Sequence, residues 1–180
     1  IANLVQDTHK PNIACVAGDL EQAHQAGVEI CRRANTVKMD SLAEVVIVSP
    51  GGAPRDKDLY QAQKALSVGE VFAKKEGCTF ILCAKADEGI GEGLFRTWLE
   101  EAKEPGEVIE RFREEGFNVG NNKAFMYARA MLKGKVLIVS EHMMLDGVPS
   151  LQEAVDLVCE REKPEHIIVL PRAVNIIPEL

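Results

Sequence analysis

Apolar residues in this chain form short continuous runs that are separated by longer stretches with apolar residues at helical spacing. The short runs are rich in Val and Ile and bounded by glycine or charged residues, which is typical of buried β-strands. They predict strands over residues 13–17, 45–49, 79–84, 136–140 and 167–170. The other stretches predict helices over residues 19–34, 58–75, 93–102, 105–115, 121–132 and 150–162.

This order, in which strands and helices alternate, favours a parallel sheet with helices on both faces. We expect an α/β fold: a three-layer α/β/α domain with a mainly parallel sheet of four or five strands. The 180 residues are enough for one such domain with a full core, and no internal repeat or low-complexity linker divides them. We therefore expect residues 1–180 to form a single domain.

The composition and net charge of the chain limit the kinds of molecule that it can bind. The chain is 46% apolar and 27% charged, as in ordinary globular domains. Its net charge of −7 argues against nucleic acid or an anionic membrane as partner, because both need a basic surface. No stretch resembles a signal peptide or a membrane span. The five cysteines lack CxxC spacing and lie in apolar settings, which predicts reduced thiols in a cytoplasmic protein.

The turn after the second predicted strand is the first candidate site. The buried run Val45–Val48 leads into Gly51 and Gly52, and Asp56 is predicted to cap the helix that follows. Ligands of open α/β sheets bind beyond the carboxyl ends of the strands. Gly51 and Gly52 are therefore candidate cleft residues, since glycine permits close backbone approach and exposed N–H groups favour an anion. A tight turn before a helix is the structural alternative.

The helix after this turn carries the second candidate site. Tyr60, Gln61 and Lys64 fall within one arc of about 100° on that helix. Val68 and Val71 extend the same side, which indicates that something covers it. A lysine supplies a point charge, and a glutamine both donates and accepts hydrogen bonds. Together they can hold the carboxylate and the hydroxyl or keto oxygen of a 2-hydroxy acid, although spacing alone also suits a surface lysine.

Three motifs give the chain a family resemblance. They are Ser49-Pro50-Gly51-Gly52-x-Pro54-x-Asp56 with Tyr60-Gln61-x-x-Lys64, Ala17-Gly18-Asp19-Leu20-Glu21-x-Ala23-His24, and Glu88-Gly89-x-Gly91. Through these motifs the chain resembles the C-terminal domain of the nickel-dependent lactate racemases. The resemblance covers nearly the whole chain but only about half of that enzyme. Because the chain also begins at Ile1 without a methionine, we expect an excised domain of a two-domain enzyme.

The resemblance implies an isomerase, a racemase or epimerase of 2-hydroxy acids, with its active site between two domains. It implies that Gln61 and Lys64 bind the substrate and that Tyr60 shapes the same pocket. The implied cofactor is a nickel-pincer nucleotide, which takes a hydride from Cα while a histidine removes the hydroxyl proton. In the family, the base histidines, the lysine that holds the cofactor and the histidine ligand of nickel come from the N-terminal domain. We therefore expect that domain as partner, no catalytic or metal-binding residue here, and no activity of this domain alone.

The glycine-rich loop over residues 87–93 suggests another function, the binding of a dinucleotide. It lacks the third glycine of GxGxxG, since position 94 is leucine, and its three carboxylates would repel a pyrophosphate. We expect this loop to form part of the interdomain cleft instead. Two alternatives stay open. One is a non-catalytic ligand-binding or interaction domain. The other is a fragment of a nicotinamide-dependent dehydrogenase, which the incomplete glycine motif makes less favoured.

The positions of the histidines bear on metal binding and catalysis, and the position of the tryptophan bears on the substrate. None of His9, His24, His142 and His166 has a partner at metal-ligand spacing, and His142 alone follows a predicted strand as a catalytic base would. Some relatives that act on lactate carry a tryptophan near the helix predicted over residues 121–132. The single tryptophan here is Trp98, which weakens lactate itself as the substrate.

Overall fold

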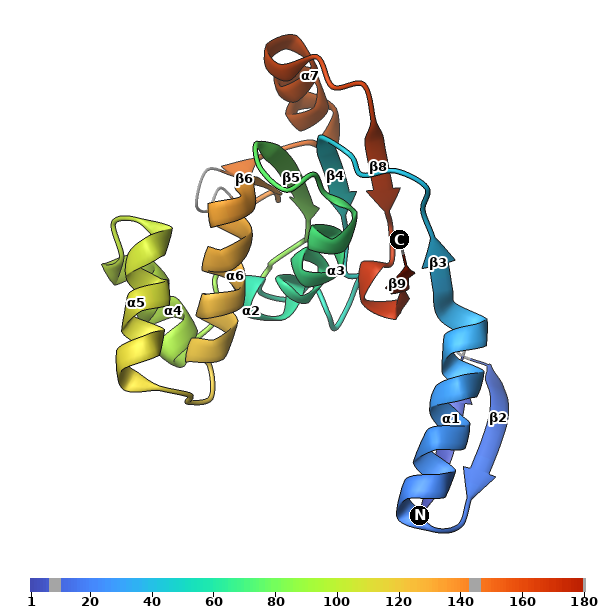
Figure 1. Cartoon of the computed structure of the whole chain (residues 1–180). Coiled ribbons are helices and arrows are strands. Elements are labelled where there is room, and N and C mark those ends of the chain that lie inside the picture. Colours follow the sequence, from blue (N-terminus) through green and yellow to red (C-terminus); the bar gives the residue numbers. More distant parts are fainter. Residues whose placement is uncertain (7–10, 143–146, 180) are drawn as a thin grey trace. The chain divides into compact units, whose positions relative to one another are not determined.

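The computed structural model describes residues 1–6, 11–142 and 147–179. These residues belong to two compact units: a smaller one of Ile1–Asp40 with the residues from Asn175 onward, and a larger one of Ser41–Val174 (Figure 1). The larger unit contains every residue predicted for the substrate site, so it is described first.

The sheet of the larger unit has five strands that all run parallel, which confirms the predicted α/β class. They are β4 (Val45–Val48), β5 (Cys78–Cys83), β6 (Gly134–Val139), β7 (Gly147–Val148) and β8 (Ile167–Leu170). The strand order is β7-β6-β5-β4-β8, and each neighbouring pair is parallel. Every residue of β4 is buried, as expected for a strand covered on both faces.

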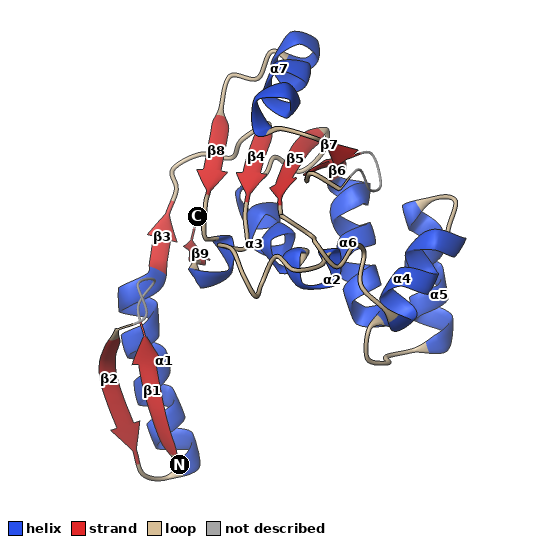
Figure 2. Ribbon diagram, turned by 180° about the vertical axis from the view of Figure 1, so that it is seen from behind, coloured by secondary structure: helices blue, strands red, loops and turns tan. Residues whose placement is uncertain are grey.

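Six helices flank this sheet in the described part of the chain (Figure 2). They are α2 (Leu59–Ala62), α3 (Lys64–Phe72), α4 (Gly93–Glu101), α5 (Pro105–Glu115), α6 (Asn121–Lys133) and α7 (Leu151–Glu162). On one face, α3 approaches so closely that a Cβ on Gly69 would lie 2.8 Å from a methyl carbon of Val48. On the other face, Val45 and Ile47 pack in a core cluster with Ala154 of α7. The sheet is thus the middle of three layers, as predicted.

The helix predicted over residues 58–75 is interrupted. It consists of α2 and α3, which meet at the buried Gln63, and it ends at Phe72. The predicted cap was wrong, because Asp58 and not Asp56 is the N-cap: its Oδ1 accepts a hydrogen bond from the backbone N–H of Gln61 at 2.6 Å. The carbonyl oxygen of Asp56 instead accepts a hydrogen bond of 2.7 Å from the loop after β5. That loop holds the backbone before Asp58 outside the helix.

The smaller unit pairs a hairpin with a helix. Its elements are β1 (Ala2–Gln6), β2 (Asn12–Ala17), α1 (Leu20–Asn35), β3 (Thr36–Lys38) and β9 (Ile177–Glu179). The strand predicted over residues 13–17 lies here as β2, antiparallel to β1, and does not join the parallel sheet. The fifth strand of that sheet is β7. Asp19 caps α1, and its Oδ1 accepts hydrogen bonds from the N–H groups of Glu21 and Gln22.

Among the residues that it describes, the structure contains no helix that combines the length and the apolar character needed to cross a bilayer.

Candidate functional site

The candidate site lies where the loops after β4 and β5 meet, at the carboxyl edge of the sheet. Four backbone hydrogen bonds join the two loops: Ala86 N to Asp56 O, Glu88 N to Lys57 O, Leu59 N to Gly89 O and Tyr60 N to Ile90 O, at 2.7 to 3.1 Å. Because the start of α2 is tied to the 86–90 loop in this way, the side chains of α2 have a fixed position relative to that loop.

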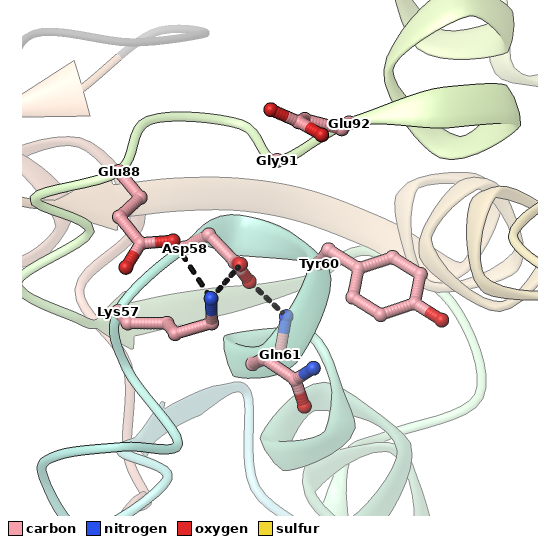
Figure 3. A pocket seen from close by; sticks show the side chains of 7 residues that line it. All are labelled: Lys57, Asp58, Tyr60, Gln61, Glu88, Gly91 and Glu92. Atoms are coloured by element: carbon pink, nitrogen blue, oxygen red, sulfur yellow. Dashed lines mark hydrogen bonds and ion pairs between the residues drawn. The ribbon is translucent and has the colours of Figure 1, made fainter.

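A pocket of about 480 Å³ opens at this junction. Its walls are formed by Lys57, Asp58, Tyr60, Gln61, Glu88, Gly91 and Glu92 (Figure 3). Lys57 Nζ lies 2.7 Å from an oxygen of Glu88 and 3.6 Å from an oxygen of Asp58. The pKa of Lys57 is raised, mainly by the hydrogen bond to Glu88, so this ammonium group stays charged and bound to its carboxylate neighbours. With three carboxylates and one ammonium, the pocket walls carry an excess of negative charge.

Tyr60 is held in place by close packing. A Cβ on Gly91 would lie 2.9 Å from Tyr60 Cβ, and the φ of Gly91 is +99°, so both space and backbone conformation require glycine there. The Tyr60 ring meets Phe95 edge-on at 5.5 Å between centroids, and Phe95 meets Tyr127 at 6.3 Å. This aromatic contact links α2 to α4 and α6.

Gln61 and Lys64, which the sequence predicts on one side of the helix, are in direct contact. Lys64 Nζ donates a hydrogen bond to Gln61 Oε1 at 2.5 Å across the junction of α2 and α3. Both residues are half-buried. Gln61 lines the pocket, whereas Lys64 lies beside it. The bond orients the Gln61 amide so that its NH₂ group and the remaining N–H protons of Lys64 can donate to a carboxylate or a carbonyl oxygen.

Lys123, near the start of α6, was not predicted as a site residue. Its side chain is half-buried, and burial followed by the charge of Lys64 lowers the pKa of Lys123. The two ammonium groups are therefore close enough to repel each other. A lysine at the beginning of a helix that precedes a parallel strand was the available signal, because such a helix begins at the carboxyl edge of the sheet.

The Gly51–Gly52 turn follows β4 as predicted, and both residues have positive φ, +91° and +85°. The N–H of Gly51 donates to Ser49 Oγ at 3.2 Å, and a Cβ on Gly51 would lie 3.2 Å from Arg172 Cγ. Neither glycine is among the residues that line the pocket. The close approach visible at this turn is therefore to Arg172 of the same chain.

Among the other candidates, His142 follows β6 and is exposed, with Nε2 3.3 Å from Asp87 Oδ1. The Asp87 pKa is lowered, mainly by the hydrogen bond from Lys85, whose Nζ lies 2.7 Å from Asp87 Oδ2. His9 lies outside the described residues. Within the described ranges, no group of three or more His, Cys, Asp or Glu side chains is arranged to hold a metal ion.

Trp98 is a buried residue of α4. The guanidinium of Arg111 lies 4.7 Å from the centroid of its ring, and Phe112 meets the same ring edge-on. These contacts join α4 to α5, which explains why the position needs a large aromatic side chain.

Known proteins are similar to this chain in sequence and in fold. The family model "Lactate racemase C-terminal domain" matches residues 38–178. The lactate racemase of Thermoanaerobacterium thermosaccharolyticum is 30% identical over 184 residues, covering 99% of this chain and 43% of that protein. The lactate racemase of Lactiplantibacillus plantarum is 29% identical over 194 residues, covering 98% and 44%. The structure of the lactate racemase apoprotein from T. thermosaccharolyticum matches with a TM-score of 0.91 and 28% identity, over 99% of this chain and 45% of that one.

The match has a defined extent. This chain spans less than half the length of the curated relatives it matches, so it corresponds to one domain of them. Both the family model and the structural match include β4, α2 and α3, the elements that carry Gln61 and Lys64. The chain therefore belongs to the family of lactate racemase C-terminal domains.

Proposed function

We propose that this chain is the C-terminal domain of a nickel-pincer-dependent 2-hydroxyacid racemase or epimerase, and that it supplies substrate-binding residues to an interdomain active site. The observation that carries the proposal is the 2.5 Å contact between Lys64 Nζ and Gln61 Oε1 at the carboxyl edge of the sheet. Family membership supports the chemical class.

Lys64 and Gln61 have complementary tasks in this proposal. The Lys64 ammonium binds the substrate carboxylate, and the Gln61 amide binds the oxygen on the adjacent carbon. That oxygen is a hydroxyl in the substrate and a carbonyl in the planar keto acid, and an amide can bond to both. A charge-assisted hydrogen bond from Lys64 contributes about 1.5–3 kcal/mol, which is roughly 10- to 100-fold in binding. Holding the intermediate through oxidation and return prevents its release.

Tyr60 forms a wall of the same site in this proposal. Its ring is fixed by Phe95 and by the close approach of Gly91, so it limits the space beside the substrate. The exposed turn at Gly51 is proposed to face the cleft between the domains. At the adjacent Gly52, no heavy atom of the described residues beyond Gly52 and its two chain neighbours lies within 4 Å of the position that a Cβ would take, which leaves its backbone open to approach.

The described residues of this chain do not fit a nickel site, since they contain no cluster of suitable ligands. As the resemblance to the nickel-dependent lactate racemases implies, we assign the nickel-pincer nucleotide and the base histidines to the N-terminal domain of the same protein. When bound there, the cofactor supplies the acceptance and return of a hydride. The part played by this chain is to bind and orient the substrate, so this domain alone is expected to be inactive.

The proposal is tested with the intact protein, produced in a host that makes the nickel cofactor. A panel of single-enantiomer 2-hydroxy acids is offered, and enantiomeric excess is followed by chiral chromatography. Racemisation of at least one acid supports the proposal. No turnover of any acid, with nickel and cofactor confirmed bound, refutes it. Tight binding of another protein without cofactor absorbance would favour an interaction domain, and binding of NAD would favour the dehydrogenase alternative.

A further inference from the structure

The hairpin of β1 and β2 has one face that is apolar and exposed. Side chains alternate along each strand, so Val5 and Val16 lie on the face toward α1, where a Cβ on Gly27 would be 3.8 and 3.4 Å from their methyl carbons. Leu4 and Cys15 lie on the opposite face, opposite each other across the two strands. Both are exposed, Leu4 to 61%. Helix α1 thus buries one apolar face of the hairpin, while the other faces solvent.

The sequence of β2 is that of a strand buried on both faces. Residues 13–17 form an unbroken apolar run, whereas a strand with one face in water alternates apolar with polar residues. Helix α1 shows the complementary pattern, because its side away from the hairpin is polar and exposed, with Gln25, Glu29 and Arg32. The helix therefore has the sequence of an outer layer, and the hairpin has that of an inner one.

A groove follows the free edge of β1. Within the described ranges β1 pairs with β2 alone, so its other edge has unpaired N–H and C=O groups, which are a template for a further strand. The groove has a volume of about 380 Å³ and touches four successive residues of β1, 3–6. Because these side chains point to alternate faces, the groove follows the strand edge and not one face. Its other wall is α1, with His24, Val28 and Cys31 (Figure 2). The helix thus extends past β1, over the place of a next strand.

We propose that the N-terminal domain of the same protein covers this hairpin. One of its strands pairs with the free edge of β1, and apolar side chains of the same domain pack on Leu4 and Cys15. This inference rests on the two-domain arrangement in the proposed function and not on its chemistry.

The comparisons favour this partner over a second copy of the chain. The family model of the C-terminal domain begins at residue 38, so the hairpin and α1 lie outside it. The T. thermosaccharolyticum racemase nevertheless matches 99% of this chain, which includes the hairpin, and the chain covers only 43% of that protein. Residues 1–37 are therefore shared with the long relatives but are not part of the C-terminal module. The remaining length of such a protein is available to cover the hairpin.

The test is alkylation of Cys15 by N-ethylmaleimide in the intact protein, followed by peptide mass spectrometry. Glu29→Cys supplies a reference thiol at an exposed position on the outer side of α1. We expect Cys15 to react at least about tenfold more slowly than this reference, because the reagent then requires a local opening of the interface. In urea, where the protein is unfolded, the two thiols should react at similar rates.

A second variant tests the same face through its packing. Leu4→Lys places a charge in the apolar contact, so it should restore the reactivity of Cys15 and lower the Tm of the intact protein. Leu132→Lys is the matched control: it changes a leucine of α6 with a similar exposed fraction, 57%, and should leave Cys15 protected. Size-exclusion chromatography of Leu4→Lys should show the oligomeric state of the parent.

Two results would overturn the inference. One is an equal rate for Cys15 and the reference thiol in the native protein. The other is conversion of a dimer to monomers by Leu4→Lys, because a second copy would then be the cover. Neither measurement needs turnover, so this inference and the proposed function can fail separately. A protein that racemises a 2-hydroxy acid while Cys15 reacts freely keeps the proposed function and loses this inference. Protection of Cys15 without turnover of any acid does the reverse.

Discussion

Lys64 donates a hydrogen bond of 2.5 Å to the side-chain oxygen of Gln61, across the junction at which α2 ends and α3 begins. The two residues are three positions apart, so a helical path brings them to the same side, and the hydrogen bond sets the orientation of the amide. Because the oxygen of Gln61 already accepts a hydrogen bond from Lys64, most of the groups that remain for a ligand are donors: the Gln61 NH₂ group and the other N–H protons of Lys64. The pair is therefore suited to an anion or a carbonyl oxygen.

Gln61→Glu should impair substrate use in the intact enzyme. A carboxylate at this position would form an ion pair with Lys64 and repel the carboxylate of the substrate, so kcat/KM should fall at least about tenfold. Gln25→Glu makes the same change of charge at an exposed position of α1 and should have no effect. A Gln61→Glu enzyme with the parent's kcat/KM would remove Gln61 from the substrate site.

Gly91→Ala should destabilise the fold. The added methyl group would lie 2.9 Å from Tyr60 Cβ at a residue with φ of +99°, and strain of this kind costs about 1–3 kcal/mol. The free energy of unfolding in urea measures the loss. Gly106→Ala is the control, because its methyl group meets open space in the first turn of α5, and it should stabilise by about 0.5–1 kcal/mol. Equal stability of the two variants would contradict the packing described for Tyr60.

Asp58→Ala should cost about 0.5–2 kcal/mol of unfolding free energy, since it removes the N-cap of α2. Asp58→Asn retains an oxygen acceptor and should recover most of that loss. Asp56→Ala should have a smaller effect than Asp58→Ala, because the structure uses the backbone oxygen of Asp56 to bind the loop after β5. If urea unfolding ranked Asp56→Ala as the more damaging change, the cap assignment would be wrong.

The carboxylate of Glu44 predicts a pH dependence of stability. Its pKa is lowered from 4.5 to about 2, mainly by the hydrogen bond from Lys74 and next by backbone N–H donors that include His166. Because the folded-state pKa is below the unfolded-state value, this stabilisation is fully present above pH 4.5 and is lost as the pH falls toward about 2.

Glu44→Gln should therefore reduce the slope of unfolding free energy against pH within that interval. Urea unfolding at a series of pH values measures the slope. Glu76→Gln, a change at an exposed carboxylate, is the control and should leave the slope closer to that of the parent. An unchanged slope in Glu44→Gln would show that the Lys74 hydrogen bond does not control this carboxylate.

The sequence predicted the middle of the central sheet because β4 and β5 are buried on both faces. The sequence of such a strand is a continuous apolar run, as at Val45–Val48, and it can be recognised without knowing which strands lie beside it. The prediction of the central sheet was wrong at two strands, for opposite reasons. The two residues of β7 are too few to show any period, and β2 has a strand-like sequence but takes a partner, β1, that only the tertiary fold reveals.

Within the site, prediction succeeded where contacts are local. Helical spacing was enough to bring Gln61 and Lys64 to one side, but the break between α2 and α3 at Gln63 was not visible, because glutamine is itself a good helix former. Lys123 was missed because its relation to Lys64 depends on the packing of α3 against α6. The spacing of residues within one helix contains no information about the adjacent helix.

The most direct test of the central claim compares Lys64→Ala with the parent in the intact, cofactor-loaded enzyme, using the 2-hydroxy acid that the enantiomer panel identifies. We predict that kcat/KM falls by about 10- to 100-fold, the contribution of one charge-assisted hydrogen bond. Lys75→Ala, which removes an exposed lysine just beyond α3, should retain full activity. An unchanged kcat/KM in Lys64→Ala would show that Lys64 takes no part in holding the substrate, against the proposed function.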